Sequence, residues 1–432
     1  MNGKRVVITG MGAVTGFGFD WQSLWQRMLD GEHCIRAWQP EGVEPGSFPV
    51  RYAAPVDLDA LPLELAAHPA WSMALERRSR LGWLAASQAV RDSGLGAGDW
   101  RDAALFCASG APQHDLADML LCDGRAAGEG AHWRHLMARQ AQVNPCGSLR
   151  QGNDRLARVI ADDLGLEGPV VNISSACAGA SQAIGNAFRL IRRGEAEMAL
   201  AGGADSVLSL DTLGALYLLG AASSEQRWGE RLCRPFERHR SGLVAGEGGG
   251  FLVLESLERA LARGATPYAE ILGYGSSLDG YKVTAPDPEG RGAVLAMQAA
   301  LDDAGLAPGR IDLINAHGTS TPLNDATESE AIKQVFAVDE HYRRLAVTAN
   351  KSQFGHLIAA AGAPELIATA LSCRDDRVPP TLNLDAADER CDLDYTPHRA
   401  VSRQVDVALS NSFGFGGLNT SLVVGKYREA GR

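Results

Sequence analysis

A strand-like run that passes through a polar turn into a helix of small residues occurs twice in this chain. The first such unit spans residues 169–193, and the second spans residues 344–374. Strands expected at 5–10 and 104–108 and a helix expected at 81–92 extend the alternation of strands and helices, which is typical of α/β layering. The two units suggest a duplicated fold, although any two strand–helix units share this general pattern.

The bulk properties of the chain exclude several classes of protein. Its 432 residues are 45% hydrophobic and 22% charged, an ordinary globular composition with enough length for a large core. No run of about 18 apolar residues occurs, so we expect no membrane span. The N-terminus enters a strand-like run without a signal peptide, so we expect a cytoplasmic protein. A formal net charge of −11 argues against nucleic acid as the main partner.

Cysteine is the first candidate for chemistry. The chain has eight cysteines and no C-x-x-C pair, which argues against a zinc site and against a disulfide framework. Cys177 differs from the others because it opens the helix expected over 177–193, directly after a sharp turn. The field of a helix N-terminus lowers a thiol pKa and favours the nucleophilic thiolate. The alternative is a buried structural cysteine.

Two histidines also follow predicted strands. His317 comes after the apolar run 311–314 and is followed by a glycine and three hydroxyl residues. His356 opens the helix expected over 356–374, where we expect a neutral imidazole. Ligands bind at this edge of open α/β sheets, although either histidine alone could be structural. A metal site is the rival interpretation, but the spacing fits no short zinc motif.

Two glycine-rich segments need separate interpretations. Residues 242–250 enter a predicted strand and lack a G-K-[ST] ending, so close backbone packing is expected there and not phosphate binding. Residues 411–419 hold two phenylalanines between glycines after the strand expected at 405–409. Such a loop can turn main-chain N–H groups toward a ligand, or it can be a simple turn between two strands.

Together these segments resemble the β-ketoacyl-acyl-carrier-protein synthases of the thiolase superfamily, in particular the type II elongating group. The resemblance runs from about Arg5 to Lys426 and includes the segments 6–15, 234–236 and 242–250. It implies the thiolase-like α/β fold, a duplicated five-layer αβαβα arrangement. It also implies a homodimer, or a heterodimer with a related ketosynthase or chain-length factor.

The resemblance also divides the chain. The first half covers residues 1–258 and carries the cysteine, with an insertion or cap at about 112–155. The second half covers residues 259–432 and carries both histidines and the glycine-rich loop.

The family's catalytic residues match positions in this chain. Cys177, His317 and His356 match a Cys-His-His triad that performs decarboxylative condensation of malonyl-carrier with a cysteine-bound acyl chain. Lys351 matches a catalytic-site lysine, which we expect to pair with Glu365 and to order the site without acting as a base.

Other positions match supporting parts of the family site. Phe415, and less closely Phe413, match a mobile gate, and the Phe415 N–H matches an oxyanion donor. The remaining matches are to carboxylates that support the His317 segment, to hydroxyls that contact pantetheine, and to a residue that limits the acyl pocket: Asp325 and Glu328, Thr319 and Thr321, and Ala111.

Departures from the family pattern concern the acyl pocket and the pathway. Ala111 is small, and Pro112-Gln113 replaces expected glycines, which hints at a specialised acyl chain such as a polyene. Primary fatty acid synthesis and a specialised polyketide pathway both stay open. A non-catalytic chain-length-factor-like subunit is the alternative outside enzymes, but such relatives lose the nucleophile that Cys177 supplies. A thiolase and a coenzyme A-dependent initiating synthase fit less well, since they use a second cysteine or an asparagine.

The partner implied by the resemblance is an acyl carrier protein, whose phosphopantetheine carries the substrates, so that no other cofactor and no metal is expected. Acyl carriers are acidic, so a chain of charge −11 needs a local basic patch to bind one. Arginines occur in two clusters that could serve, or that could be ordinary solvated surface: Arg77, Arg78 and Arg80, and then Arg227 and Arg231.

Overall fold

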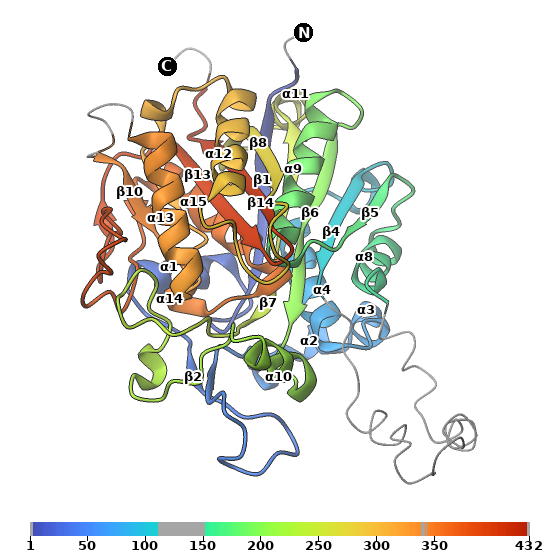
Figure 1. Ribbon diagram of the computed structural model, residues 1–432. Coiled ribbons are helices and arrows are strands. Elements are labelled where there is room, and N and C mark those ends of the chain that lie inside the picture. The colour runs from blue at the N-terminus through green and yellow to red at the C-terminus, as the bar shows by residue number, and fades with distance from the viewer. Residues whose placement is uncertain (1–2, 111–151, 338–341, 343, 430–432) are drawn as a thin grey trace, which may run out of the picture.

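The structure is a computed structural model that describes residues 3–110, 152–337, 342 and 344–429. Ten of its strands form one mixed sheet (Figure 1). Five of them belong to the first half of the chain: β1 (Val6–Val14), β4 (Ala104–Ser109), β5 (Val170–Ile173), β6 (Met198–Ser206) and β7 (Glu247–Ser256). Five belong to the second half: β8 (Ala269–Leu278), β9 (Leu313–Asn315), β10 (Ala346–Thr348), β13 (Val407–Gly414) and β14 (Leu418–Gly425).

The two halves have the same strand order and the same strand directions. In the first half β1 is antiparallel to β7 and β7 to β6, while β6 is parallel to β4 and β4 to β5. In the second half β8 is antiparallel to β14 and β14 to β13, while β13 is parallel to β9 and β9 to β10. The first strands of the halves pair with each other, with Val6 opposite Ile271. The predicted duplication is therefore confirmed.

Helices pack in layers around these strands. The longer helices are α4 (Arg77–Asp92), α8 (Arg155–Leu164), α9 (Gly179–Arg192), α12 (Arg291–Ala304), α13 (Pro322–Phe336) and α15 (Gly362–Asp375). Helices α9 and α15 lie between the half-sheets within one large apolar cluster, while α4 and α8 cover the outer face of the first half and α12 and α13 that of the second. This gives the αβαβα order of a thiolase-like fold.

Small residues let the two central helices approach their neighbours. A Cβ on Gly185 of α9 would lie 2.3 Å from the Tyr274 ring, and one on Gly362 of α15 would lie 2.0 Å from Ser181 Oγ. The predicted close packing of the glycine run before β7 is also found. Gly248 has φ +155°, and a Cβ there would lie 2.1 Å from the Val14 carbonyl oxygen.

Shorter elements complete the described chain. They are α1 (Trp21–Leu29), α2 (Leu63–Ala66), α3 (Pro69–Met73), α10 (Leu210–Leu218), α11 (Leu257–Ala262) and α14 (Lys351–Phe354), with the short strands β2 (Arg36–Ala37), β3 (Tyr52–Ala53), β11 (Arg377–Val378) and β12 (Val401–Ser402). Among the described helices, none combines the length and apolar character that a membrane crossing requires.

The predicted element bounds need two corrections. The helix expected at 81–92 begins one turn earlier, at Arg77. His356 does not open the second small-residue helix, because it follows α14 and is separated from α15, which begins at Gly362, by a 3₁₀ turn at Ile358–Ala360. Most of the insertion expected at about 112–155 lies outside the described residues.

Candidate active site

The three residues of the predicted triad converge at the carboxyl ends of strands from both halves. Cys177 follows β5, His317 follows β9, and His356 follows β10 and α14. The His356 Nε2 atom lies 3.1 Å from Cys177 Sγ, and the two imidazole rings are 5.3 Å apart and nearly perpendicular. One ligand-type atom from each of the three residues lies within 4.8 Å of the others, and all three side chains are buried.

A strained turn presents the cysteine. Ala176 has φ +43°, a conformation that costs a non-glycine residue on the order of 1–3 kcal/mol, and it begins the 3₁₀ turn Ala176–Ala178 ahead of α9. Gly414 lies against this turn, and a Cβ there would be 3.1 Å from the Cys177 nitrogen. Strain of this kind persists where the surrounding structure holds a reactive side chain in place.

The predicted lowering of the Cys177 pKa is wrong. Burial raises the pKa of the Cys177 thiol to about 12, although Lys351 and hydrogen bonds from the Phe415 and Cys177 backbones oppose the rise. Desolvation of the thiolate outweighs the helix terminus here because α9 begins two residues later. The resting residue is therefore a thiol.

Hydrogen bonds assign the tautomers of both histidines. The Lys351 ammonium can only donate, and its Nζ lies 3.2 Å from His317 Nδ1. The Ile358 N–H donates to His356 Nδ1 at 3.2 Å. Each Nδ1 is thus an acceptor, so each ring carries its proton on Nε2. Burial first, and then Lys351, holds the pKa of both histidines well below the usual value, so both rings are neutral.

Lys351 is fully occupied by its neighbours. Its Nζ lies 2.6 Å from Glu365 Oε1, 2.6 Å from the His317 carbonyl oxygen and 3.2 Å from His317 Nδ1. An ammonium has three protons, and these three acceptors use them all. The predicted pair with Glu365 is present and buried, and burial raises the pKa of Glu365 to about 7 against the opposing effect of Lys351. This arrangement orders the His317 ring.

Carboxylates hold the backbone of the His317 segment. The two oxygens of Glu328 accept the His317 and Gly318 N–H groups, each at 2.8 Å, and burial raises the pKa of Glu328 to about 7. Asp325 accepts the Phe236 N–H at 2.9 Å, and burial raises its pKa as well. The two carboxylates thus lie where the resemblance expects them.

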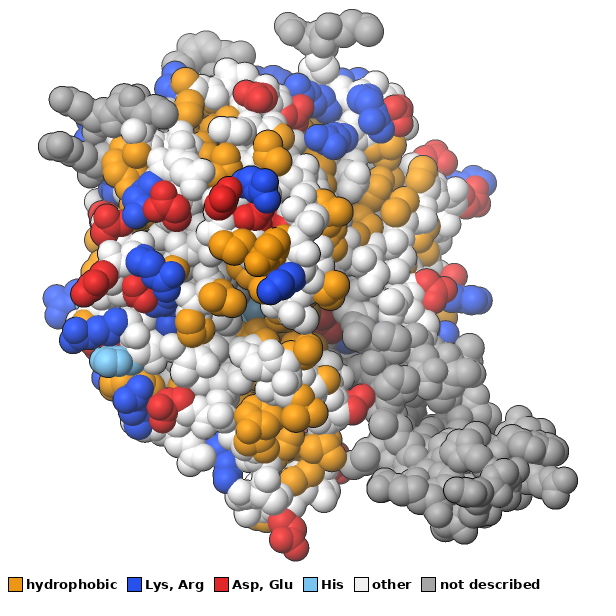
Figure 2. Space-filling model, viewed as in Figure 1, with side chains coloured by type: hydrophobic (Ala, Val, Ile, Leu, Met, Phe, Trp, Pro, Cys, Tyr) orange, Lys and Arg blue, Asp and Glu red, His pale blue; other side chains and the backbone are white. Residues whose placement is uncertain are grey.

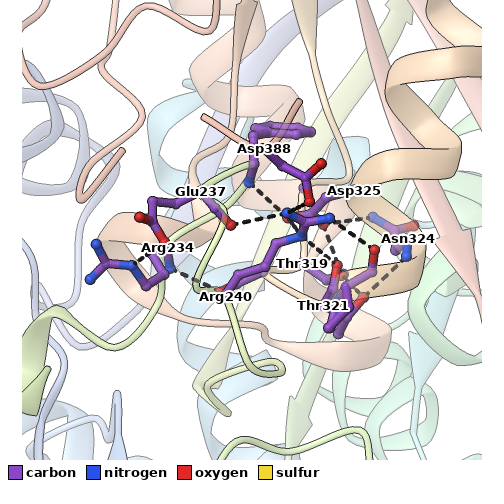
Figure 3. A network of polar contacts seen from close by, with 12 residues as sticks. Arg234, Glu237, Arg240, Thr319, Thr321, Asn324, Asp325 and Asp388 are labelled. Carbon is purple, nitrogen blue, oxygen red and sulfur yellow. Dashed lines mark hydrogen bonds and ion pairs between the residues drawn. The ribbon is translucent and has the colours of Figure 1, made fainter. Parts of the chain in front are cut away.

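A wider polar network continues from Asp325 (Figure 3). Arg240 lies between two carboxylates, 3.6 Å from Asp325 and 2.8 Å from Asp388. Thr319 Oγ1 lies 3.4 Å from Asp325 Oδ1 and 2.9 Å from Thr321 Oγ1. The network therefore fixes the two predicted pantetheine-contacting threonines relative to the histidine segment.

A cavity of about 290 Å³ joins these residues to the surface. Cys177, both histidines, both threonines, Phe413 and Phe415 line it. The Phe413 ring lies 5.9 Å from that of His317, and Phe415 occupies the turn between β13 and β14. Backbone hydrogen bonds tie this turn to residues 279–283, from Gly416 N–H to the Val283 oxygen at 2.7 Å and from Asp279 N–H to the Gly417 oxygen at 2.9 Å.

The structure contradicts one predicted docking residue and weakens others. Arg78 is fully buried and pairs with Glu76 at 2.6 Å, so it cannot meet a partner. Arg77 pairs with the buried Glu247, and Arg80 stacks on the Trp71 ring at 4.9 Å. The other two are exposed but paired, Arg227 with Glu225 and Arg231 with Asp385. The pocket residue Ala111 lies outside the described residues.

Sequence reasoning missed Asp205, which supports the His356 side of the site. Its carboxylate accepts the Ala359 N–H at 3.1 Å, and burial raises its pKa to about 6. Ala359 belongs to the 3₁₀ turn whose first residue, Ile358, sets the His356 tautomer and has φ +48°. An acidic residue at the end of the apolar run 198–204 was the available signal.

The spacing of Cys177, His317 and His356 would also suit a metal ion. A metal needs an imidazole lone pair, whereas both Nε2 atoms carry protons because both Nδ1 atoms accept hydrogen bonds. The site therefore presents two N–H donors beside a thiol, which suits the stabilisation of an oxyanion.

Comparison with known proteins identifies the class that this fold and site define. Residues 3–260 match the family model for the Beta-ketoacyl synthase N-terminal domain, and residues 268–385 match that for the Beta-ketoacyl synthase C-terminal domain. The chain belongs to the β-ketoacyl synthase family. It is 37% identical to 3-oxoacyl-(acyl-carrier-protein) synthase 2 of Staphylococcus aureus strain N315, over 98% of this chain and 99% of the relative.

Solved structures give the same family. The ishigamide ketosynthase/chain length factor superposes with a TM-score of 0.85 at 33% identity, over 99% of this chain and all of the other. The AntDE:AntF complex, a type II PKS acyl-carrier protein with its ketosynthase bound to the hexaketide, superposes with a TM-score of 0.83 at 31% identity, over 98% of this chain and all of the other.

Proposed function

We propose that this chain is a 3-oxoacyl-acyl-carrier-protein synthase, an acyltransferase in which Cys177 carries the growing chain. The observation that carries the proposal is a pair of neutral imidazoles, each with its proton on Nε2, that line one cavity together with a buried thiol. The alternative of a non-catalytic partner subunit is not favoured, because the nucleophile and both donors are present and assembled.

In the first step Cys177 attacks the carbonyl carbon of an acyl thioester on the carrier. The sulfur–carbonyl bond to Cys177 forms, the bond to the carrier thiol breaks, and the thiol proton of Cys177 ends on that leaving thiol. The thiolate is costly to form at a pKa of about 12, so the nearby His356 N–H and the Phe415 N–H must stabilise it as it develops. The backbone N–H groups of Cys177 and Phe415 hold the oxyanion of the tetrahedral intermediate.

In the second step malonyl-carrier loses carbon dioxide. Cleavage of the carbon–carbon bond leaves its electron pair on the thioester, so that negative charge collects on the thioester oxygen. The Nε2–H groups of His317 and His356 both lie within reach of one atom in this space, and they stabilise that charge where it forms. The neutral rings suit this task because each already carries a proton on Nε2 and need not take one up first.

In the third step the enolate carbon attacks the acyl-Cys177 carbonyl. The new carbon–carbon bond forms, the bond to Cys177 sulfur breaks, and the thiolate takes a proton from water. The product is a 3-oxoacyl chain, longer by two carbons, on the carrier. The apolar cavity and the aromatic rings of Phe413 and Phe415 provide space for the acyl chain of a fatty acid, polyketide or polyene pathway.

The partners of this reaction are an acyl carrier protein and a second ketosynthase-type subunit. The carrier's phosphopantetheine delivers both substrates through the cavity, past Thr319 and Thr321. The edge strand β5 exposes Val170 and Val171, whose side chains are apolar and solvent-accessible, which supports a homodimer or heterodimer across this edge.

Reconstitution with purified carriers tests the proposal. Wild type is incubated with acyl-carriers of graded length and unsaturation plus malonyl-carrier, and carbon dioxide and 3-oxoacyl product are both quantified. The proposal predicts one carbon dioxide per product with at least one chain, and no product with Cys177→Ala. Carbon dioxide without product from any chain, or equal product from both proteins, would refute it.

A further inference from the structure

The mouth of the cavity is ringed by exposed apolar side chains from three separate parts of the chain. Leu218 and Leu219 lie at the end of α10, Val283 follows β8, and Leu323 lies in the first turn of α13. Their exposed fractions are 83%, 56%, 74% and 58%. Leu219, Val283 and Leu323 line the cavity that holds Cys177, and Leu218 adjoins them. We call these four residues the apolar collar.

The collar is visible on the face that contains the cavity (Figure 2). Hydrophobic side chains gather above and below a hollow near the middle of this face, and the lower group lies over α10. Single exposed leucines are ordinary, but apolar residues clustered at the mouth of a binding cavity mark an interaction surface. Side chains this exposed contribute little to folding, which also favours a role in binding.

The charges around the collar show what kind of contact this face can make. The arginines that the sequence suggested for docking are paired: Arg78 with Glu76 inside the protein, Arg227 with Glu225, and Arg231 with Asp385. Exposed pairs of this kind retain little net attraction for an acidic partner. At the collar itself Lys282 is exposed and stacks on Tyr281 at 5.3 Å, and within the described part of the chain it has no carboxylate partner.

We infer that the apolar collar is the docking surface for the acyl carrier protein, which binds through an apolar face with Lys282 beside it as a steering charge. The inference rests on the proposed function. A substrate tethered to a carrier can reach Cys177 only if the carrier stands over the mouth of the cavity, and the collar is the surface that surrounds that mouth. Apolar contact does not depend on charge, so it can hold an acidic carrier against a chain whose net charge is −11.

The test compares one acyl group on two donors. Wild type and Leu218→Gln, a change at the collar residue that does not line the cavity, are assayed for Cys177 acylation with octanoyl-acyl carrier protein and with octanoyl-N-acetylcysteamine, a short thioester that needs no docking. Loss of the apolar contact should raise the KM for the carrier donor about tenfold, equivalent to about 1.4 kcal/mol, while kcat/KM for the short donor changes less than about twofold. The matched control Leu261→Gln removes an exposed leucine that does not line the cavity, and it should match wild type with both donors.

The salt dependence of the KM for the carrier donor distinguishes apolar docking from electrostatic docking. With a collar of leucines and valine, the carrier KM should change less than about threefold between 50 mM and 500 mM NaCl. A normal carrier KM in the collar variant, or a KM that rises steeply with salt and responds only to Lys282→Glu, would overturn the inference.

Other outcomes distinguish the remaining explanations. An altered oligomeric state of the collar variant by sedimentation, with an unchanged carrier KM, would assign the collar to a second copy of the chain and would also overturn it. No acylation of wild type by either donor would refute the proposed function itself, since the short donor does not depend on the collar.

Discussion

Replacing Lys351 by Met should separate the two halves of the reaction. The ammonium donates to His317 Nδ1 at 3.2 Å and so keeps the His317 proton on Nε2, whereas the Ile358 N–H sets the His356 tautomer independently. Without Lys351, His317 can place its proton on Nδ1 and lose its role as a donor. Loss of one oxyanion donor lowers a rate by about 10²–10³, equivalent to about 2.7–4 kcal/mol.

Acylation of Cys177 should suffer much less. That step depends on the His356 N–H and on the Phe415 and Cys177 backbone N–H groups, which Lys351→Met leaves in place. Lys351 does favour the thiolate by its charge, so we expect a loss below about tenfold, or about 1.4 kcal/mol. The free energy of unfolding should fall by about 3 kcal/mol, the lower end of the range for breaking a buried ion pair. The loss stays small because Glu365, whose pKa is about 7, can take up a proton and avoid a buried unpaired charge.

Two assays measure the split. Carbon dioxide release from malonyl-carrier reports decarboxylation, and intact-protein mass after incubation with an acyl donor reports acylation. Lys351→Met/Glu365→Gln removes the unpaired carboxyl and should recover thermal stability without recovering decarboxylation. Equal losses in both assays, or full decarboxylation in the single variant, would refute the role of Lys351 as the group that orients His317.

Three further predictions concern the carboxylates and the corrected docking cluster. Burial raises the pKa of Glu328 to about 7, so the stability that its protonated form contributes is present below the unfolded-state pKa and is lost as pH rises through 7. Between pH 5 and pH 8, chemical denaturation should therefore show the free energy of unfolding of Glu328→Gln increasing by about 2–3 kcal/mol relative to that of wild type. A difference between the two proteins that does not change with pH would contradict the raised pKa. Arg77→Glu places a carboxylate against the buried Glu247, so it should lower the free energy of unfolding by about 2–4 kcal/mol and reduce activity equally with carrier and short donors. A variant of normal stability with a raised KM for the carrier donor alone would instead support Arg77 as a docking residue. Asp205→Ala leaves the Ala359 N–H without its acceptor, and it should slow decarboxylation and acylation each by about tenfold because both steps use the His356 N–H. Asp205→Asn retains an acceptor and should stay within about threefold of wild type in both assays. Equal effects of the two substitutions would argue against this hydrogen bond.

The sequence predicted most of the fold and the reacting residues. Short apolar runs ending in polar turns mark strands of an α/β protein, and the recurrence of one strand–turn–helix unit indicated a duplication that the strand order of the two halves confirms. Cys177, His317 and His356 were each candidates because they follow predicted strands, and the resemblance to the β-ketoacyl synthases implied that they form one triad.

The features that the sequence did not predict depend on packing between segments far apart in the chain. The Cys177 pKa depends on burial by both halves of the chain, which outweighs the local effect of a helix terminus. Arg78 looked like a surface residue, but Glu76 and the Gly110 and Gly152 carbonyls enclose it. The His356 tautomer depends on a 3₁₀ turn that no local pattern predicted.

Mapping the acyl adduct tests directly whether Cys177 carries the acyl chain. Wild type, Cys177→Ala and Cys107→Ala, a control at another buried free cysteine, are incubated with acyl-carrier and analysed by intact mass and by peptide mapping. We expect one acyl group on Cys177 in wild type and in Cys107→Ala, and none in Cys177→Ala. An adduct that persists in Cys177→Ala, or 3-oxoacyl product formed without any adduct on Cys177, would contradict it.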